Sequence, residues 1–113
     1  RLLILGISYK KNIDDDRESP AYEIMNILIK KKINFDYNDP FFKYIRIGRN
    51  INLKKKSINL NKKNLRKYTA VLIVTNHDNY NYKFISENSN VIYDTRGVFR
   101  DKKLKKCKNV VFI

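Results

Sequence analysis

Three short polar groups each follow an apolar run, and their side chains are the ones best suited to chemistry. The groups are Tyr9-Lys10, Thr75-Asn76-His77 and Asp94-Thr95-Arg96. Lysine supplies a mobile positive charge, and arginine supplies a planar fork of donors that fits phosphate oxygens. Lys10 and Arg96 together therefore suit a phosphate or diphosphate if the fold brings them together. The alternative is that both are ordinary solvated loop residues.

The elements that would position these groups are predicted by apolar runs and by helical periodicity. Predicted strands span residues 2–8, 33–37, 44–47, 70–75, 91–94 and 110–113, and predicted helices span 20–32, 62–67 and 80–87. The strongest helix signal starts with Ser19 as N-cap and Pro20 as the first helical residue. Ile27 and Ile29 are predicted to broaden the buried stripe of that helix.

Alternating strands and helices predict an α/β fold, with an open, mostly parallel, Rossmann-like sheet in three layers. Such sheets bind ligands outside the carboxyl ends of their strands. The three polar groups are therefore expected at one rim of the sheet, whatever the strand order. The dinucleotide fingerprint G-x-G-x-x-G is absent, because Gly6 is the only glycine near the first strand.

The formal net charge is +14, which attracts nucleic acid, acidic membranes or phosphorylated small molecules. The lysines are spread along the chain, and solvent-facing lysine is the alternative explanation. No element combines clustered arginines with aromatic residues, as nucleic-acid binders often do. No apolar run approaches the roughly 20 residues that span a bilayer. We therefore expect neither nucleic acid nor membrane as a partner.

Other reactive residue types in the sequence favour structural roles. The consecutive carboxylates of residues 14–16 cannot all face one metal ion. Carboxylates just before a helix interact favourably with the positive N-terminal end of its dipole, and Arg17 can pair with one of them. His77 is the only histidine and Cys107 the only cysteine. Neither has a catalytic partner at recognisable spacing, so we expect no metal site, and a lone cysteine favours a reducing, cytoplasmic location.

Four blocks of the sequence resemble the C-terminal domain of the UDP-glucose/GDP-mannose dehydrogenase family. They are residues 5–21 (LGISYKKNIDDDRESPA), 37–40 (YNDP), 74–78 (VTNHD) and 93–99 (YDTRGVF). The blocks occur in the family's order and cover nearly the whole chain except its middle and its final residues. The last two blocks are more similar to the branch that acts on UDP-N-acetylhexosamines than to the UDP-glucose branch.

This resemblance implies an NAD-dependent enzyme that oxidises C6 of a UDP-sugar to the carboxylate, for polysaccharide synthesis. In the family, an N-terminal domain binds NAD, a cysteine in the middle of the chain is catalytic, and the C-terminal domain closes over the sugar nucleotide. The resemblance places Tyr9 and Lys10 against the substrate, Arg96 at its nucleotide part, and Arg17 at the NAD. It also implies two protein partners, namely the rest of the same chain and further copies in a homo-oligomer.

The sequence also departs from the family pattern. Asn12 stands where the family often has aspartate, and Cys107 lies too late in the chain to be the nucleophile. Since the chain begins at Arg1 on an apolar run, residues 1–113 are expected to be a single C-terminal nucleotide-sugar-binding domain. This fragment of a longer enzyme should contain no catalytic residue and be inactive alone. A stand-alone nucleotide-binding module and a basic nucleic-acid-binding domain remain open as alternatives.

Overall fold

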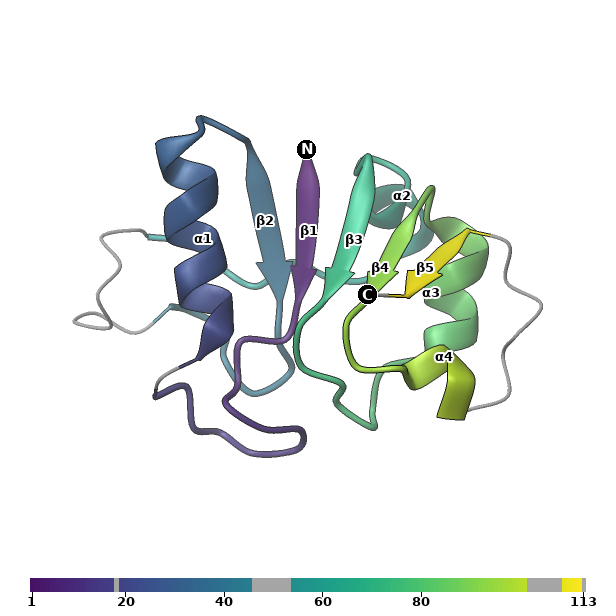
Figure 1. The fold of residues 1–113 in the computed structure, drawn as a ribbon, viewed down its shortest axis with the longest axis horizontal. Helices are drawn as coiled ribbons and strands as arrows, with labels where there is room; N and C mark the ends of the chain where they lie inside the picture. Colours follow the sequence, from purple (N-terminus) through teal and green to yellow (C-terminus); the bar gives the residue numbers. More distant parts are fainter. Residues whose placement is uncertain (18, 46–53, 102–108, 113) are drawn as a thin grey trace.

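The computed structural model describes residues 1–17, 19–45, 54–101 and 109–112 of the chain. In order, their elements are β1 (Leu2–Leu5), α1 (Pro20–Lys30), β2 (Phe35–Asn38), α2 (Lys62–Leu65), β3 (Ala70–Ile73), α3 (Tyr82–Asn88), β4 (Ile92–Asp94), α4 (Val98–Asp101) and β5 (Val110–Phe112). The five strands form one sheet in the order β2-β1-β3-β4-β5, and all neighbours are parallel (Figure 1). The prediction of an open parallel α/β sheet is confirmed.

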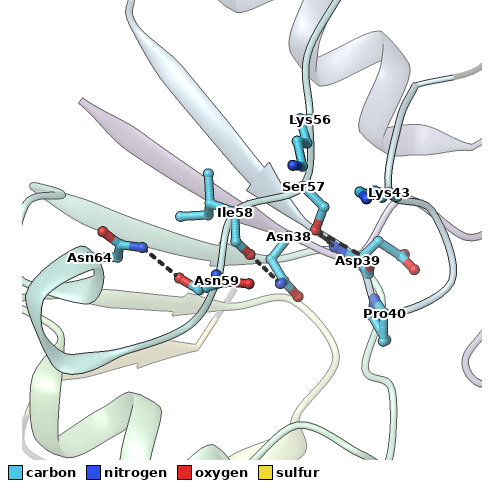
Figure 2. Close-up of a pocket in the computed structure, with 9 residues that line it drawn as sticks. All are labelled: Asn38, Asp39, Pro40, Lys43, Lys56, Ser57, Ile58, Asn59 and Asn64. Atoms are coloured by element: carbon cyan, nitrogen blue, oxygen red, sulfur yellow. Dashed lines mark hydrogen bonds between the residues drawn. The ribbon is translucent and has the colours of Figure 1, made fainter.

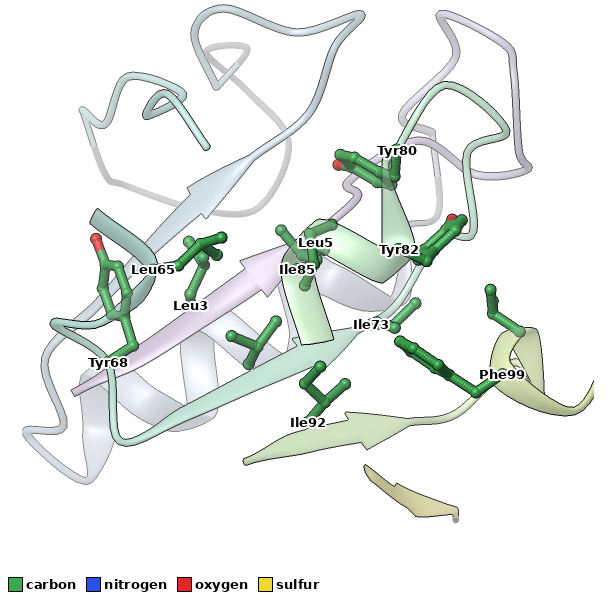
Figure 3. Close-up of a cluster of buried hydrophobic side chains, with 12 residues drawn as sticks. Leu3, Leu5, Leu65, Tyr68, Ile73, Tyr80, Tyr82, Ile85, Ile92 and Phe99 are labelled. Atoms are coloured by element: carbon green, nitrogen blue, oxygen red, sulfur yellow. The ribbon is translucent and has the colours of Figure 1, made fainter. Parts of the chain in front are cut away.

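Helices cover both faces of the sheet and make three layers (Figure 1). Side chains alternate along each strand, so Leu3 and Leu5 point to one face while Ile4 points to the other. The face of Leu3 packs against α2, α3 and α4, with Ile85 and Phe99 among the buried contacts (Figure 3). The face of Ile4 packs against α1. The three-layer arrangement predicted from the sequence is therefore present.

Helix α1 begins as predicted, because Ser19 Oγ accepts a hydrogen bond of 3.2 Å from the Ala21 amide and Pro20 occupies the first helical position. The prediction that Ile27 and Ile29 broaden the buried stripe is wrong, since they are 52% and 42% exposed. At about 100° per residue, Ile27 turns well away from the stripe, and Ile29 lies at its edge in the last turn.

Several predicted boundaries shift. Strand β1 ends at Leu5 because Gly6 adopts a φ of 92°, which leaves the extended conformation. Helix α4 was not predicted. In place of the strand predicted at 44–47, the described residues show only an isolated antiparallel bridge between Tyr44 and Lys56. Residues 46–47, Cys107 and Ile113 lie outside the described residues. Across the described part of the chain, no helix has the length and apolar character needed to cross a membrane.

Candidate functional site

The sheet has a topological switch point between β1 and β3, because the chain moves from β1 to β2 in one direction and from β3 to β4 in the other (Figure 1). Open α/β sheets bind ligands in the crevice at the carboxyl ends of the strands at such a point. A cavity of about 260 Å³ lies at this edge. Its lining residues are Tyr9, Lys10, Lys11, Thr75, Asn76 and Arg96. The structure thus confirms that Lys10, Thr75 and Arg96 share one rim, and Tyr9 joins them.

The ends of β1 and β3 are in direct contact at the floor of this rim. The amides of Val74 and Thr75 both donate to the Leu5 carbonyl, at 2.9 and 3.1 Å. Thr75 Oγ1 donates to the Ser8 carbonyl at 2.7 Å. A Cβ atom at Gly6 would lie only 2.4 Å from Thr75 Cβ, so the approach of the two chains requires glycine at this position.

Arg96 is held in place by the turn that follows β4. Buried Asp94 accepts hydrogen bonds from the Arg96 amide and the Phe99 amide, each of 3.0 Å, and so caps α4. Arg96 Nε donates to the Val74 carbonyl at 2.8 Å. This bond lays the side chain across the end of β3. The two terminal nitrogens of the guanidinium remain as donors for a ligand in the cavity.

Lys10 reaches the cavity from the loop that follows β1. The Tyr9 amide donates to the Asp15 carbonyl at 2.5 Å, so the loop folds back on itself. Lys10 Nζ lies 5.8 Å from the centre of the Tyr9 ring. None of the described residues that line the cavity is acidic, and Lys10, Lys11 and Arg96 are all cationic. The cavity therefore suits an anion, as the sequence predicted.

A buried Asp39–His77 pair lies below the rim. His77 Nδ1 accepts a hydrogen bond of 2.8 Å from the Asn12 amide. The ring proton is consequently assigned to Nε2, which donates to Asp39 Oδ2 at 2.9 Å. Both side chains are fully buried. These bonds fit the structural role that the sequence favours for His77, although the burial of the ring was not predicted.

Asp39 gathers further donors from the loop after β1. Its Oδ2 accepts hydrogen bonds from the Ile7 amide at 2.7 Å, the Ser8 amide at 3.1 Å and Ser8 Oγ at 3.2 Å. Burial raises the pKa of this carboxyl, but the bonds from His77 and from backbone amides outweigh burial and leave the pKa below its ordinary value. Asp39 is therefore an ionised anchor of the loop.

The acidic run has a local structural role, as expected. Arg17 Nη2 contacts Asp15 Oδ2 at 2.7 Å, and the Arg17 side chain is 72% exposed. Buried Asp16 accepts a hydrogen bond of 2.5 Å from Tyr22 Oη in α1. Within residues 1–17, 19–45, 54–101 and 109–112, no cluster of His, Cys, Asp and Glu could hold a metal ion. Arg17 is not among the residues that line the cavity.

A second cavity, of about 670 Å³, lies at the end of β2 (Figure 2). Its polar groups largely bind one another. Asn38 Nδ2 donates to the Ile58 carbonyl at 2.6 Å, and the Asp39 amide donates to Ser57 Oγ at 3.0 Å. These bonds fasten residues 56–59 over the end of β2. Lys43 and Lys56 also line this second cavity, but so does the carboxylate of Asp39. We therefore assign the candidate site to the first cavity, where cations from two strand ends converge and no acidic residue is among the described lining residues.

Sequence reasoning missed the positions that support the rim. It assigned no role to Asp39 and treated Asn12 only as a departure from a family pattern. A usable signal was present: Ser8, Asp39 and His77 each follow one of three strands, so parallel pairing places them at one edge. What the sequence did not reveal is that β1 lies between β2 and β3, which brings the three together.

The fold and the rim define an open parallel α/β domain that presents a cationic crevice to an anionic ligand. The chain belongs to the UDP-glucose/GDP-mannose dehydrogenase family, since residues 3–101 match the UDP binding domain of that family. This match contains every residue of the rim and confirms the resemblance noted in the sequence. Comparison with curated proteins gives no match.

Solved structures share the fold. A UDP-D-ManNAc dehydrogenase from Pyrococcus horikoshii superposes with a TM-score of 0.67 at 22% identity, covering 98% of this chain and 24% of that protein. A UDP-N-acetyl-mannosamine dehydrogenase from Staphylococcus aureus, in its native structure, gives 0.64 at 22% identity, covering 99% of this chain and 25% of the other. The chain thus spans about a quarter of these proteins, and the likeness establishes the fold alone.

Proposed function

We propose that this chain binds a UDP-sugar as the nucleotide-sugar-binding domain, residues 1–113, of an NAD-dependent UDP-sugar 6-dehydrogenase. The observation that carries the proposal is the cationic cavity at the switch point, where Lys10 and Arg96 approach from different strand ends. A diphosphate offers several anionic oxygens to such a pair. The sugar in this proposal is an N-acetylhexosamine, in keeping with the names of the similar solved structures.

In this proposal, each residue of the rim has a separate task. Lys10 and Arg96 neutralise the diphosphate, and Tyr9, which is 43% exposed beside Lys10, contacts the substrate. Arg17 is exposed and oriented by Asp15, which fits a side chain that contacts a cofactor held by another domain. That cofactor is NAD, which accepts hydride from C6 of the sugar when bound. The partners would be the rest of the enzyme and further copies of it, in the cytoplasm.

The nearest test is a titration of the 113-residue chain with UDP, followed by NMR. A charge-assisted hydrogen bond is worth about 1.5–3 kcal/mol. Lys10→Ala and Arg96→Ala should therefore each raise the Kd for UDP by roughly tenfold to a hundredfold. Lys30→Ala and Arg66→Ala are matched controls, because α1 ends and α2 lies at the opposite end of the sheet (Figure 1).

Unchanged UDP affinity in the two variants would contradict the proposal. If Lys10→Ala and Arg96→Ala fold and bind UDP as tightly as the controls do, both side chains are solvated loop residues. In that case the cavity is not the nucleotide site. An oligonucleotide that binds the chain more tightly than UDP does would favour the nucleic-acid alternative, with binding that weakens steeply as salt rises.

Oxidation of the sugar should need more chain than these residues. The sequence has no dinucleotide fingerprint, and its one cysteine does not match the family's nucleophile. We expect no NADH to form when the 113-residue chain is mixed with NAD and any UDP-sugar. Steady NADH formation that Cys107→Ser abolishes would show that the assignment of this chain to a binding domain is wrong.

A further inference from the structure

We propose that His77 is a positioning residue for the loop that carries Lys10, and that it acts through the main chain of that loop. This inference rests on the proposed function, because it concerns how the UDP-binding rim acquires its shape. His77 does not line the cavity. Its ring is buried between Asp39 on one side and the Asn12 amide on the other. It joins the ends of β2 and β3 to the loop after β1.

The loop is fixed at two points, and Lys10 lies between them. At the first point, Ser8 donates from its amide and its hydroxyl to Asp39. At the second, the Asn12 amide donates to His77. The bond between His77 and Asp39 joins the two points at 2.9 Å. Residues 9–11 therefore form a short segment that is held at both ends by one buried pair of side chains, Asp39 and His77.

The chemistry of this arrangement is specific to histidine. A neutral imidazole donates from one nitrogen and accepts at the other, and here each nitrogen has a partner: Nε2 has the buried carboxylate of Asp39, and Nδ1 has the Asn12 amide in a partly buried bond. The Asn12 amide needs an acceptor, whereas the carboxylate of Asp39 needs a donor. A buried polar group left without its partner is costly, so a residue that serves only one side should release the other.

The side chain of Asn12 adds further hydrogen bonds at the second fixed point of the loop. Its φ is 64°, a left-handed conformation that asparagine tolerates better than most residues. Asn12 Nδ2 donates to Asp78 Oδ2 at 2.8 Å, and the Asp78 amide donates to Asn12 Oδ1 at 2.9 Å. The ionised aspartate that the family often has at this position would lack the donor and repel Asp78. The amide side chain of Asn12 therefore suits Asp78, because it both donates to that residue and accepts from it.

Two substitutions separate the two roles of the ring. Asparagine places its amide oxygen near the position of His Nδ1, so His77→Asn keeps the acceptor for Asn12 and loses the donor to Asp39. Glutamine places its amide nitrogen near the position of Nε2, so His77→Gln keeps the donor to Asp39 and releases the loop. UDP affinity, hydrogen exchange of the Asn12 amide and the unfolding midpoint should be measured for both variants and for the wild type.

The positioning role predicts opposite outcomes for the two variants. His77→Gln should raise the Kd for UDP about three- to tenfold and speed exchange of the Asn12 amide, with the smaller loss of stability. His77→Asn should lose more stability yet keep most of its UDP affinity. The proposal is overturned if the Asn12 amide exchanges equally fast in His77→Gln and wild type, or if UDP affinity follows stability alone.

Failure of the proposed function gives a different result. If the wild-type chain does not bind UDP, the function is wrong, while hydrogen exchange still decides whether His77 holds the loop. If the variants do not fold, a measurement on the wild type still tests the proposed contacts of His77. Long-range ¹H–¹⁵N NMR of the imidazole should show the proton on Nε2 and none on Nδ1, and the opposite tautomer would refute the proposed contacts.

Discussion

Two aspartates three residues apart belong to opposite ends of the sheet and differ in their burial and in the kind of partner that each one has. Asp36, near the start of β2, is 22% exposed and pairs with Arg1 and Lys55, each at 3.4 Å. Tyr68 Oη donates to it at 2.7 Å. Asp39, just past the end of β2, is fully buried and accepts mainly from backbone amides and a neutral histidine.

The contrast shows where the fold places its most specific polar bonds. Two partners of Asp36 are long cationic side chains that water also solvates, and such pairs contribute little. The third partner, the hydroxyl of buried Tyr68, can donate to an amide oxygen as well as to a carboxylate. The partners of Asp39 lie in the loops that follow β1 and β3, and their burial keeps them from water if the carboxylate is lost. The end of the sheet that carries the candidate site is therefore the end where a polar substitution should cost most. Four experiments test this difference.

The largest effect is expected for Asp39→Asn. Asp39 Oδ1 accepts from the Phe41 amide at 2.8 Å, while Oδ2 accepts from the buried donors named above. The substitution keeps one acceptor oxygen and places an NH2 group against the donors of the other. Removing one partner of a buried charged network costs roughly 3–5 kcal/mol. Urea unfolding monitored by circular dichroism measures this loss. A cost below that of Asp36→Asn would reverse the comparison.

Gly6→Ala should follow closely. The new methyl group would meet Thr75 at 2.4–2.7 Å, and alanine would have to adopt a φ of 92°. Overpacking and a left-handed backbone together cost roughly 2–5 kcal/mol. Gly97→Ala is the matched control, since its φ of 68° is also positive but no atom lies within 4 Å of the added methyl. Equal losses of unfolding free energy in the two variants would mean that the contact with Thr75 is not tight.

Acid should destabilise the chain through both aspartates. Burial raises the pKa of Asp36, but the bonds from Tyr68 and Lys55 outweigh it, and the pKa of Asp39 is lowered in the same sense by His77. Since the folded-state values lie below 3.8, this stability is present above that pH and is lost as the pH falls beneath it. Unfolding free energies between about pH 6 and pH 2 should fall less steeply in Asp39→Asn than in wild type. Parallel curves would show that folding does not lower the pKa of Asp39, and wild-type stability that falls less steeply than that of Asp39→Asn would show that folding raises it.

The smallest effect is expected for Asp36→Asn, which should cost less than about 1 kcal/mol. Its ion pairs with Arg1 and Lys55 are partly exposed, so salt screens them. The difference in unfolding free energy between Asp36→Asn and wild type should shrink further at about 1 M salt. A large, salt-independent loss would place Asp36 in the same class as Asp39.

Features with a local cause were predicted from the sequence. Apolar runs located β1 and β3, and the pair Ser19-Pro20 located the start of α1. Both signals come from residues that are consecutive in the sequence, so no knowledge of the tertiary structure is needed to recognise them. Lys10 and Arg96 could be placed at one rim because the carboxyl ends of parallel strands meet at one edge in any strand order. Their roles toward a ligand stay predictions.

Features that depend on strand order could not be predicted in this way. Asp39 and His77 are 38 positions apart. Their places after two strands put both at one edge of the sheet, but their contact depends on β1 lying between β2 and β3, which the sequence did not reveal. Helix α4 has four residues, which is too short for a hydrophobic period to appear. The exposure of Ile27 follows from its angle around the helix, which apolar composition alone does not reveal.

The bonds that hold the loop after β1 have a consequence for protein engineering. Asp39 and His77 accept hydrogen bonds from the backbone amides of Ile7, Ser8 and Asn12. Every residue type except proline has such an amide. The course of the backbone is therefore largely independent of the side chains at residues 9–11. Those three positions form a natural cassette for a randomised library, in which ligand preference can be changed while the scaffold beneath keeps its shape.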